Sequence, residues 1–327
     1  MAIVAVAGET GGIGRAIVEA IVRRGKHNVK ILSRKANDSL ADELGAPIIP
    51  VDYSAIDTVI SSIFTMPVSG IAPEVALIRA SQSSRTTHRF IPSNWAFHWA
   101  KGKTNTLYSC CGLTKRANGA CSSNSREDLA PSIPMKLLAL DELKKTDLEY
   151  TVFYVGFPLD YYAGPSIKSY VSPLIVVIDM ECNMAAIPGS GNTPIAFTHS
   201  LDVGKYVDAS LDLKKWDASY RIIGDKATWN EFVKLAETLK GTQFTIVHDS
   251  VEDLKKGKVT LLPSTKKYLS SMTINALESQ SVFLSTFGLL FEDGTFDLEE
   301  KGALNNLFPE IGALKIKQAV QAAVNRV

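Results

Sequence analysis

The sequence predicts an α/β protein with a doubly wound parallel sheet and a smaller C-terminal α/β region. Three observations predict this fold. An apolar, β-branched run opens the chain at residues 3–7, and glycines follow it at Gly-x-x-Gly-x-x-Gly spacing. Apolar residues at helical spacing then continue to Gly25. Two further apolar runs, at 29–32 and 46–51, flank a polar segment at 38–44 with helical character. Such alternation of strand and helix signals indicates a parallel sheet covered by helices.

The glycine turn has the properties of a dinucleotide-binding turn. Residues without a Cβ let the backbone approach a pyrophosphate, and the following helix offers unpaired N–H groups and its positive dipole end. An ordinary tight turn also accepts glycines, but the position of this triplet directly between a strand and a helix favours phosphate binding. The predicted sheet is therefore of the Rossmann type. The turn residues expected to bind the cofactor are Gly8, Thr10, Gly11, Gly12, Ile13 and Gly14.

The end of the second predicted strand indicates which nicotinamide cofactor the turn holds. In NAD-specific Rossmann domains an acidic residue near this point binds the ribose 2′-hydroxyl. Here Arg34 and Lys35 occupy the position and no acid does, and two cations suit a 2′-phosphate. We therefore expect NADP(H) rather than NAD(H). The alternative is that both side chains are ordinary solvated surface charges.

The chain after the third strand departs from the regular alternation. Residues 58–64 follow almost directly, so they form either the fourth strand without a preceding crossover helix or that helix itself. Their spacing alone favours the helix. A helix at 73–83 and a strand at 89–93 then restore the order. Residues 101–132 show no period, and we expect disorder there rather than a loop that covers an active site.

Order returns after Pro134. Leu137, Leu138 and Leu143 are expected on the buried side of a helix, and a strand at 150–155 follows.

The remaining chain is mixed and carries no second glycine motif. Its expected elements are strands at 220–224 and 244–248 and helices at 228–239, 266–287 and 311–327. We divide the chain into a nucleotide-binding domain at 1–155, with an irregular segment near 101–132, and a smaller substrate-binding region at 156–327. Elements of the second region can return to the sheet.

Composition limits the classes of partner. The chain has 327 residues, of which 46% are apolar, enough for one large or two smaller domains. A net charge of +1 gives no reason to expect nucleic acid or a membrane surface as a partner. No apolar run is long enough to span a bilayer. The four cysteines match neither a disulfide framework nor a zinc spacing, so we expect no metal and a cytoplasmic protein. The oligomeric state stays open.

Several segments, taken in order, resemble the NmrA-like, isoflavone reductase-like branch of atypical short-chain dehydrogenases/reductases. The matching segments are residues 8–14, 33–35, 51–53, 89–93, 136, 151–162 and 200–204. They spread over almost the whole chain except the stretch near 101–132. The resemblance implies an NADP(H)-binding Rossmann domain with a smaller substrate domain. In catalytic relatives it implies an oxidoreductase that reduces a small aromatic or polyketide-like molecule, often in secondary metabolism beside partner enzymes of a biosynthetic pathway.

The resemblance also implies that Lys136 is the catalytic residue. Typical short-chain dehydrogenases use Tyr-x-x-x-Lys, and no tyrosine of this chain has a lysine four residues later. This family instead uses one lysine at the start of the helix that follows the fifth strand. An ammonium beside a nicotinamide can donate a proton while hydride arrives, and can hold the ribose. The residues alone would place such a lysine in solvent.

Phe157, Tyr161 and Tyr162 are the substrate-binding candidates. Aromatic rings after the carboxyl end of a strand commonly form an apolar pocket wall with polar tips, and the corresponding loop of the family flanks cofactor and substrate. Plain packing between the two domains explains the same residues equally well.

Two other functions stay open. NmrA-type relatives bind NADP and control a transcription factor without turnover, and such a sensor need not keep Lys136. The short segment before the fourth strand and the stretch 101–132 depart from the family pattern. A degenerate member with an incomplete nucleotide site is therefore the third alternative.

Overall fold

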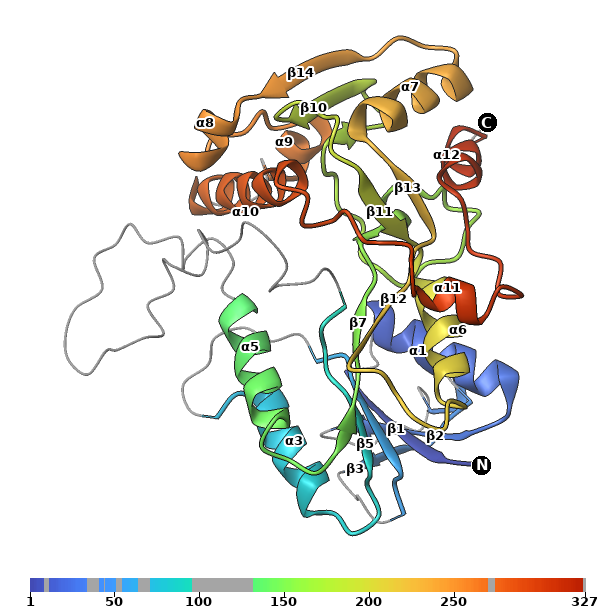
Figure 1. Cartoon of the computed structure of the whole chain (residues 1–327). Helices are drawn as coiled ribbons and strands as arrows, with labels where there is room; N and C mark the ends of the chain where they lie inside the picture. The colour runs from blue at the N-terminus through green and yellow to red at the C-terminus, as the bar shows by residue number, and fades with distance from the viewer. Residues whose placement is uncertain are drawn as a thin grey trace, which may run out of the picture.

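The computed structural model shows a parallel sheet with its helices, joined to a second part built from smaller sheets and helices (Figure 1). It describes residues 1–8, 12–33, 41–43, 45–50, 55–63, 71–95, 132–269 and 274–325. The irregular segment 101–132 lies outside the described residues except for Ser132. Most of the expected helix at 38–44 lies outside them too.

The main sheet is parallel throughout and has the strand order β3-β2-β1-β4-β5-β6. Its strands are β1 (Ile3–Ala7), β2 (Asn28–Ser33), β3 (Ile48–Pro50), β4 (Thr58–Ser61), β5 (Arg89–Ile91) and β6 (Glu149–Tyr150). The order reverses between β1 and β4, which is the switch point where doubly wound sheets bind ligands. The predicted α/β fold class is therefore confirmed.

Strand β4 settles the open question about the segment after the third strand. Thr58–Ser61 pair with both β1 and β5, so the helix that the spacing favoured is wrong there. All four residues are buried, and a strand buried on both faces loses the two-residue period that would identify it. The connection from Pro50 to Thr58 is long enough for this crossing. It spans three strand spacings, about 14 Å, and returns roughly four residues along the strands, about 13 Å, which together make roughly 19 Å. Its eight residue steps reach roughly 26 Å.

Helices cover both faces of the sheet (Figure 1). They are α1 (Gly12–Arg24) and α6 (Ser200–Ser210) on one face, and α3 (Pro73–Ser83) and α5 (Ser132–Leu143) on the other. Because strand side chains alternate, Val4 and Val6 of β1 join the core under α1 and α6. Ala5 and Ala7 join the core under α3 and α5.

Helix α6 comes from the second half of the chain and returns to pack on α1. A Cβ on Gly204 would lie 2.4 Å from the carbonyl oxygen of Ala16, so only glycine permits this approach. Arg24 adds a hydrogen bond from its guanidinium to the carbonyl oxygen of Asp208 (3.2 Å).

One expectation for α5 is wrong. Leu143 is fully buried as predicted, but Leu138 is 44% exposed and Ala139 is buried instead. Residues 139 and 143 are four apart and share the face that meets the sheet, while position 138 is turned about 100° away toward solvent.

The second part contains three small sheets and a large apolar core. Its strands are β7 (Val152–Tyr154), β8 (Phe157–Pro158), β9 (Ile178–Asp179), β10 (Met184–Pro188), β11 (Ile195–Thr198), β12 (Ser219–Arg221), β13 (Asp225–Ala227) and β14 (Thr245–Asp249). Its other helices are the 3₁₀ helix η2 (Leu159–Tyr162), α7 (Trp229–Lys240), α8 (Val251–Lys255), α9 (Pro263–Leu269), α10 (Ile274–Glu292), α11 (Leu304–Leu307) and α12 (Ile316–Val324). The sheet orders are β14-β10-β9, β13-β11-β8 and β12-β7.

The expected segment 266–287 is helical where it is described, in α9 and α10, and residues 270–273 lie outside the described residues. The last helix is shorter than predicted and begins at Ile316. Helix α7 is as predicted. Thr228 caps it through a reciprocal bond with Glu231, and Gly241 ends it in the left-handed conformation (φ +66°).

Gly156 makes the bend between two of the small sheets. It separates β7, which pairs with β12, from β8, which pairs with β11. Its φ of +73° bends the chain, and an added Cβ would lie 2.2 Å from the carbonyl oxygen of Ala196. A side chain here meets both a strained backbone and a close neighbour.

We expect Gly156→Ala to destabilise the protein by roughly 2–5 kcal/mol, because the left-handed conformation and the overpacking each cost energy. Gly241→Ala is the matched control. It has a similar φ of +66° but no heavy atom within 4 Å of the added Cβ, so only the backbone cost of about 1–2 kcal/mol applies. Urea unfolding of both variants measures the difference. Equal losses would show that the contact with Ala196 is unimportant.

Candidate functional site

The candidate site lies at the carboxyl edge of the main sheet, where β1, β4 and β5 end side by side. Gly8 follows β1, Ser62 follows β4 and Ser93 follows β5. Parallel sheets bind ligands at this edge, because the loops and helix N-termini converge there.

The glycine turn packs closely against the end of β4. Gly8 has φ +87°, and a Cβ on it would lie 2.5 Å from the carbonyl group of Ser62. A Cβ on Gly14 would lie 2.4 Å from the carbonyl oxygen of Gly8. Ser62 N–H donates to the carbonyl oxygen of Ala7 (2.7 Å). The turn therefore has the tight geometry that a dinucleotide-binding turn needs, and it places the N-terminus of α1 at the sheet edge.

Part of the predicted cofactor set falls outside the described residues. Gly8, Gly12, Ile13 and Gly14 are described, and they form the turn and the first residues of α1. Thr10, Gly11, Arg34 and Lys35 lie outside the described residues.

The N–H group of Gly12 already has a partner in this structure. It donates to the carbonyl oxygen of Tyr170 (2.9 Å). The Tyr170 side chain is fixed along α1, because its hydroxyl donates to Glu19 (2.5 Å) and the Arg15 guanidinium lies 4.5 Å from its ring centroid. Lys168 forms an ion pair with the same Glu19 (2.8 Å). A phosphate that used the Gly12 N–H would take the place of this carbonyl oxygen.

Lys136 projects from α5 to the end of β5. Its Nζ donates to the carbonyl oxygen of Ser93 (2.6 Å), and the side chain is partly buried rather than free in solvent. Burial lowers the pKa of the Lys136 ammonium to about 8, while the charge of Glu74 acts in the opposite direction. The structure thus brings the predicted lysine to the same edge as the glycine turn.

Glu74 is a residue of this edge that sequence reasoning missed. It lies in the first turn of α3, is 1% exposed, and accepts a hydrogen bond from the Ser93 N–H (2.5 Å). Desolvation raises its pKa, and its contacts with Ser93, Ser61 and Lys136 act against that rise. An acid in a first helical turn is ordinary, because it stabilises the helix dipole. The sequence therefore contains no signal that this one faces a lysine.

Trp95 closes the edge between β4 and β5. Its Nε1 donates to the carbonyl oxygen of Ser61 (3.1 Å), and its ring stacks on Phe153 with 5.7 Å between centroids. These contacts hold the chain after β5 against the end of β4. The sequence gives no signal for this tryptophan either, because Trp95 belongs to no motif and no periodic pattern.

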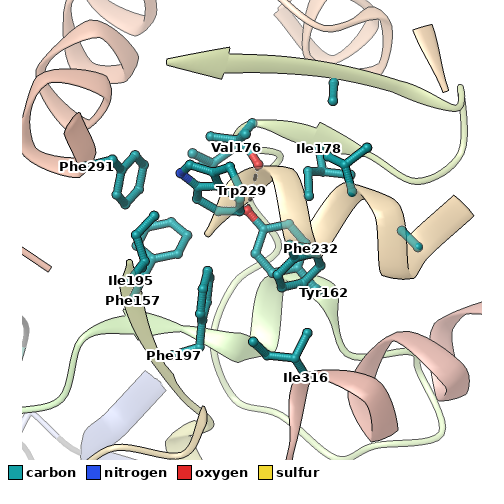
Figure 2. Close-up of a cluster of buried hydrophobic side chains, with 14 of the residues drawn as sticks. Phe157, Tyr162, Val176, Ile178, Ile195, Phe197, Trp229, Phe232, Phe291 and Ile316 are labelled. Carbon is teal, nitrogen blue, oxygen red and sulfur yellow. Dashed lines mark hydrogen bonds between the residues drawn. The ribbon is translucent and has the colours of Figure 1, made fainter. Parts of the chain in front are cut away.

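The three aromatic candidates lie in the core of the second part rather than at the sheet edge. Phe157 and Tyr162 are each 2% exposed (Figure 2). The Tyr162 hydroxyl donates to the carbonyl oxygen of Val176 (2.6 Å), and the Phe157 ring meets that of Phe291 at 5.0 Å. Tyr161 is partly buried against Phe157. Packing therefore accounts for Phe157 and Tyr162 in this conformation.

The part of the chain that the structure describes contains no cluster of three or more metal-ligating side chains. None of its helices is long and apolar enough to cross a membrane. Cys182, the cysteine within the described ranges, is exposed and forms no disulfide. His199 is buried and caps α6, because its Nδ1 accepts from the Leu201 N–H (3.3 Å).

Comparison with known proteins identifies the group to which the chain is related. No family model matches it. Oxidoreductase BOA1 of Botryotinia fuckeliana is 30% identical over 323 residues, which cover 94% of this chain and 95% of the relative. Among solved structures, an isoflavone reductase superposes with a TM-score of 0.65 at 16% identity, covering 97% of this chain and 98% of its own. AtPrR2 with NADP+ and (+)-pinoresinol superposes with a TM-score of 0.67 at 16% identity, covering 98% of each chain. Near-complete coverage at these levels of similarity leaves one assignment: the chain belongs to the NmrA-like, isoflavone reductase-like family of atypical short-chain dehydrogenases/reductases.

Proposed function

We propose that this protein is an NADPH-dependent reductase of a small aromatic or polyketide-like metabolite, with Lys136 as the proton donor. The observation that carries the proposal is the position of the Lys136 ammonium, bound to Ser93 at the same carboxyl edge of the sheet as the glycine turn, with β4 between them. The name of the fungal relative, and the NADP+ and (+)-pinoresinol in one solved neighbour, support the reaction class and a small-molecule substrate.

The residues at the edge fit a nicotinamide dinucleotide. Gly8 and Gly14 make a turn too tight for any Cβ, and the N–H groups at the start of α1 would bind the pyrophosphate. Arg34 and Lys35, both outside the described residues, would bind the 2′-phosphate. NADPH, when bound, supplies the hydride for a carbonyl group or a conjugated double bond.

Lys136 would supply the proton that this reduction requires. Its ammonium can donate to a developing alkoxide or enolate directly or through a water molecule, and it can also orient the nicotinamide ribose. A pKa of about 8 suits this task, because the lysine is mostly protonated at neutral pH yet gives up its proton more readily than an exposed lysine does.

We expect Arg34→Ala to weaken NADPH binding about 10- to 100-fold, the loss of one charge-assisted contact to a phosphate. NADH lacks the 2′-phosphate, so its affinity should stay within about twofold. Titration of the purified protein with each cofactor, followed by fluorescence, measures both. An equal loss for the two cofactors would contradict the assignment of Arg34.

We expect the rate of NADPH oxidation, measured with a panel of aromatic ketones and conjugated enones, to be constant below pH 8 and to fall about tenfold per pH unit above it. The sign follows from the donor role, because only the protonated amine can give a proton and that form disappears as the pH rises through its pKa of about 8.

Lys136→Ala should lower kcat by roughly 10²- to 10⁴-fold, the usual contribution of a general acid. Lys144→Ala, at the exposed residue directly after α5, is the control and should leave the rate unchanged. Full turnover in the Lys136→Ala variant would rule out this lysine as the donor. NADPH binding without turnover of any substrate in the panel would favour the sensor function.

A further inference from the structure

Two charged side chains from different helices hold the same residue at the end of β5. Glu74 on α3 accepts a hydrogen bond from the Ser93 N–H (2.5 Å). Lys136 on α5 donates to the Ser93 carbonyl oxygen (2.6 Å). Ser93 lies two residues beyond β5, so both helices are tied to the sheet edge through one residue.

The Glu74 carboxyl is buried more deeply than helix capping requires. It is 1% exposed, and its Oε2 has no hydrogen-bond donor within bonding geometry among the described residues. A buried carboxylate with one oxygen unsatisfied is costly unless a positive charge compensates it. Three groups in the described part of the chain favour the charged form of Glu74. They are the Ser61 side chain from β4, the Ser93 N–H just after β5 and the Lys136 ammonium from α5.

We propose that Glu74 is a positioning residue for Lys136, which fixes Ser93 as the acceptor of the ammonium and keeps that ammonium protonated through its negative charge. The inference rests on the proposed function in one respect: the charge of Lys136 matters for turnover only if Lys136 donates the proton. The coupling between the two side chains is a property of the fold and can be measured without a substrate.

Two opposing effects act on the protonation of Lys136. Burial favours the neutral amine and is the larger effect, which brings the pKa to about 8. The charge of Glu74 raises the pKa and limits that fall. Without this charge a larger fraction of the amine would be neutral at the same pH.

Glu74→Gln separates charge from geometry. Glutamine keeps the length of the side chain and an oxygen that can accept from the Ser93 N–H, but it carries no charge. The titration of Lys136 is followed in the full chain without substrate, by the pH dependence of its acetylation with acetic anhydride and mass spectrometry. Lys144 and Lys145, the exposed residues that directly follow α5, serve as internal controls.

In Glu74→Gln we expect the midpoint of the Lys136 titration to fall by about one pH unit, the usual effect of losing a nearby opposite charge. The midpoints of Lys144 and Lys145 should not move. The alkaline limb of the rate profile should shift by the same amount as Lys136, whereas a purely structural role for Glu74 would lower the rate at every pH equally.

Glu74→Asp keeps the charge on a side chain shorter by one methylene. Its Lys136 titration midpoint should therefore lie closer to that of the unchanged protein than to that of Glu74→Gln. If Glu74→Gln does not fold, a smaller fall in Glu74→Asp than in Glu74→Ala becomes the test. An unmoved Lys136 midpoint in the folded variants would overturn the inference, whatever the turnover. A lowered Lys136 midpoint in Glu74→Gln would support the coupling between the two side chains. If Lys136→Ala also kept full turnover, the coupling would stand and the proposed role of Lys136 as proton donor would be contradicted.

Discussion

The close contact between the glycine turn and the end of β4 is the constraint on which the rest of the sheet edge depends. Gly8 lies against the Ser62 carbonyl group, and Gly14 lies against the carbonyl oxygen of Gly8. A methyl group at either position would push α1 away from the sheet, because backbone rather than a flexible side chain opposes it. The tight turn therefore sets where α1 begins and which strand ends surround a ligand.

Buried charge distinguishes this edge from the rest of the sheet. Most of the core under α3 and α5 is aliphatic or aromatic, yet Glu74 and Lys136 lie at its upper margin around Ser93. Taking charged groups out of water costs free energy unless they are paired and hydrogen-bonded, so stability alone does not account for these two side chains. Groups that violate the rules of a core in this way occur mainly where a protein binds or reacts.

Local patterns predicted the elements that depend on local physics. The glycine turn and the bounds of α3 and α7 follow from short-range sequence, and the structure has both helices within one residue of the predicted bounds. Strand β4 could not be identified with confidence because burial on both faces removes its period. Leu138 was misplaced because the orientation of α5 is set by its contact with the sheet. Glu74 could not be identified from local sequence, because the lysine on which its charge acts lies on a helix about sixty residues later in the chain.

The return of α6 to α1 has a consequence for synthesis of the chain. The bond between Arg24 and Asp208 joins residues 184 positions apart, and α6 covers the face of the sheet to which Val4 and Val6 contribute. Until the ribosome has made residue 210, that apolar face has no α6 to cover it. Long-range contacts of this kind slow folding and leave transient surfaces prone to aggregation. A chaperone would therefore protect this protein most while the N-terminal half has been synthesised and α6 has not.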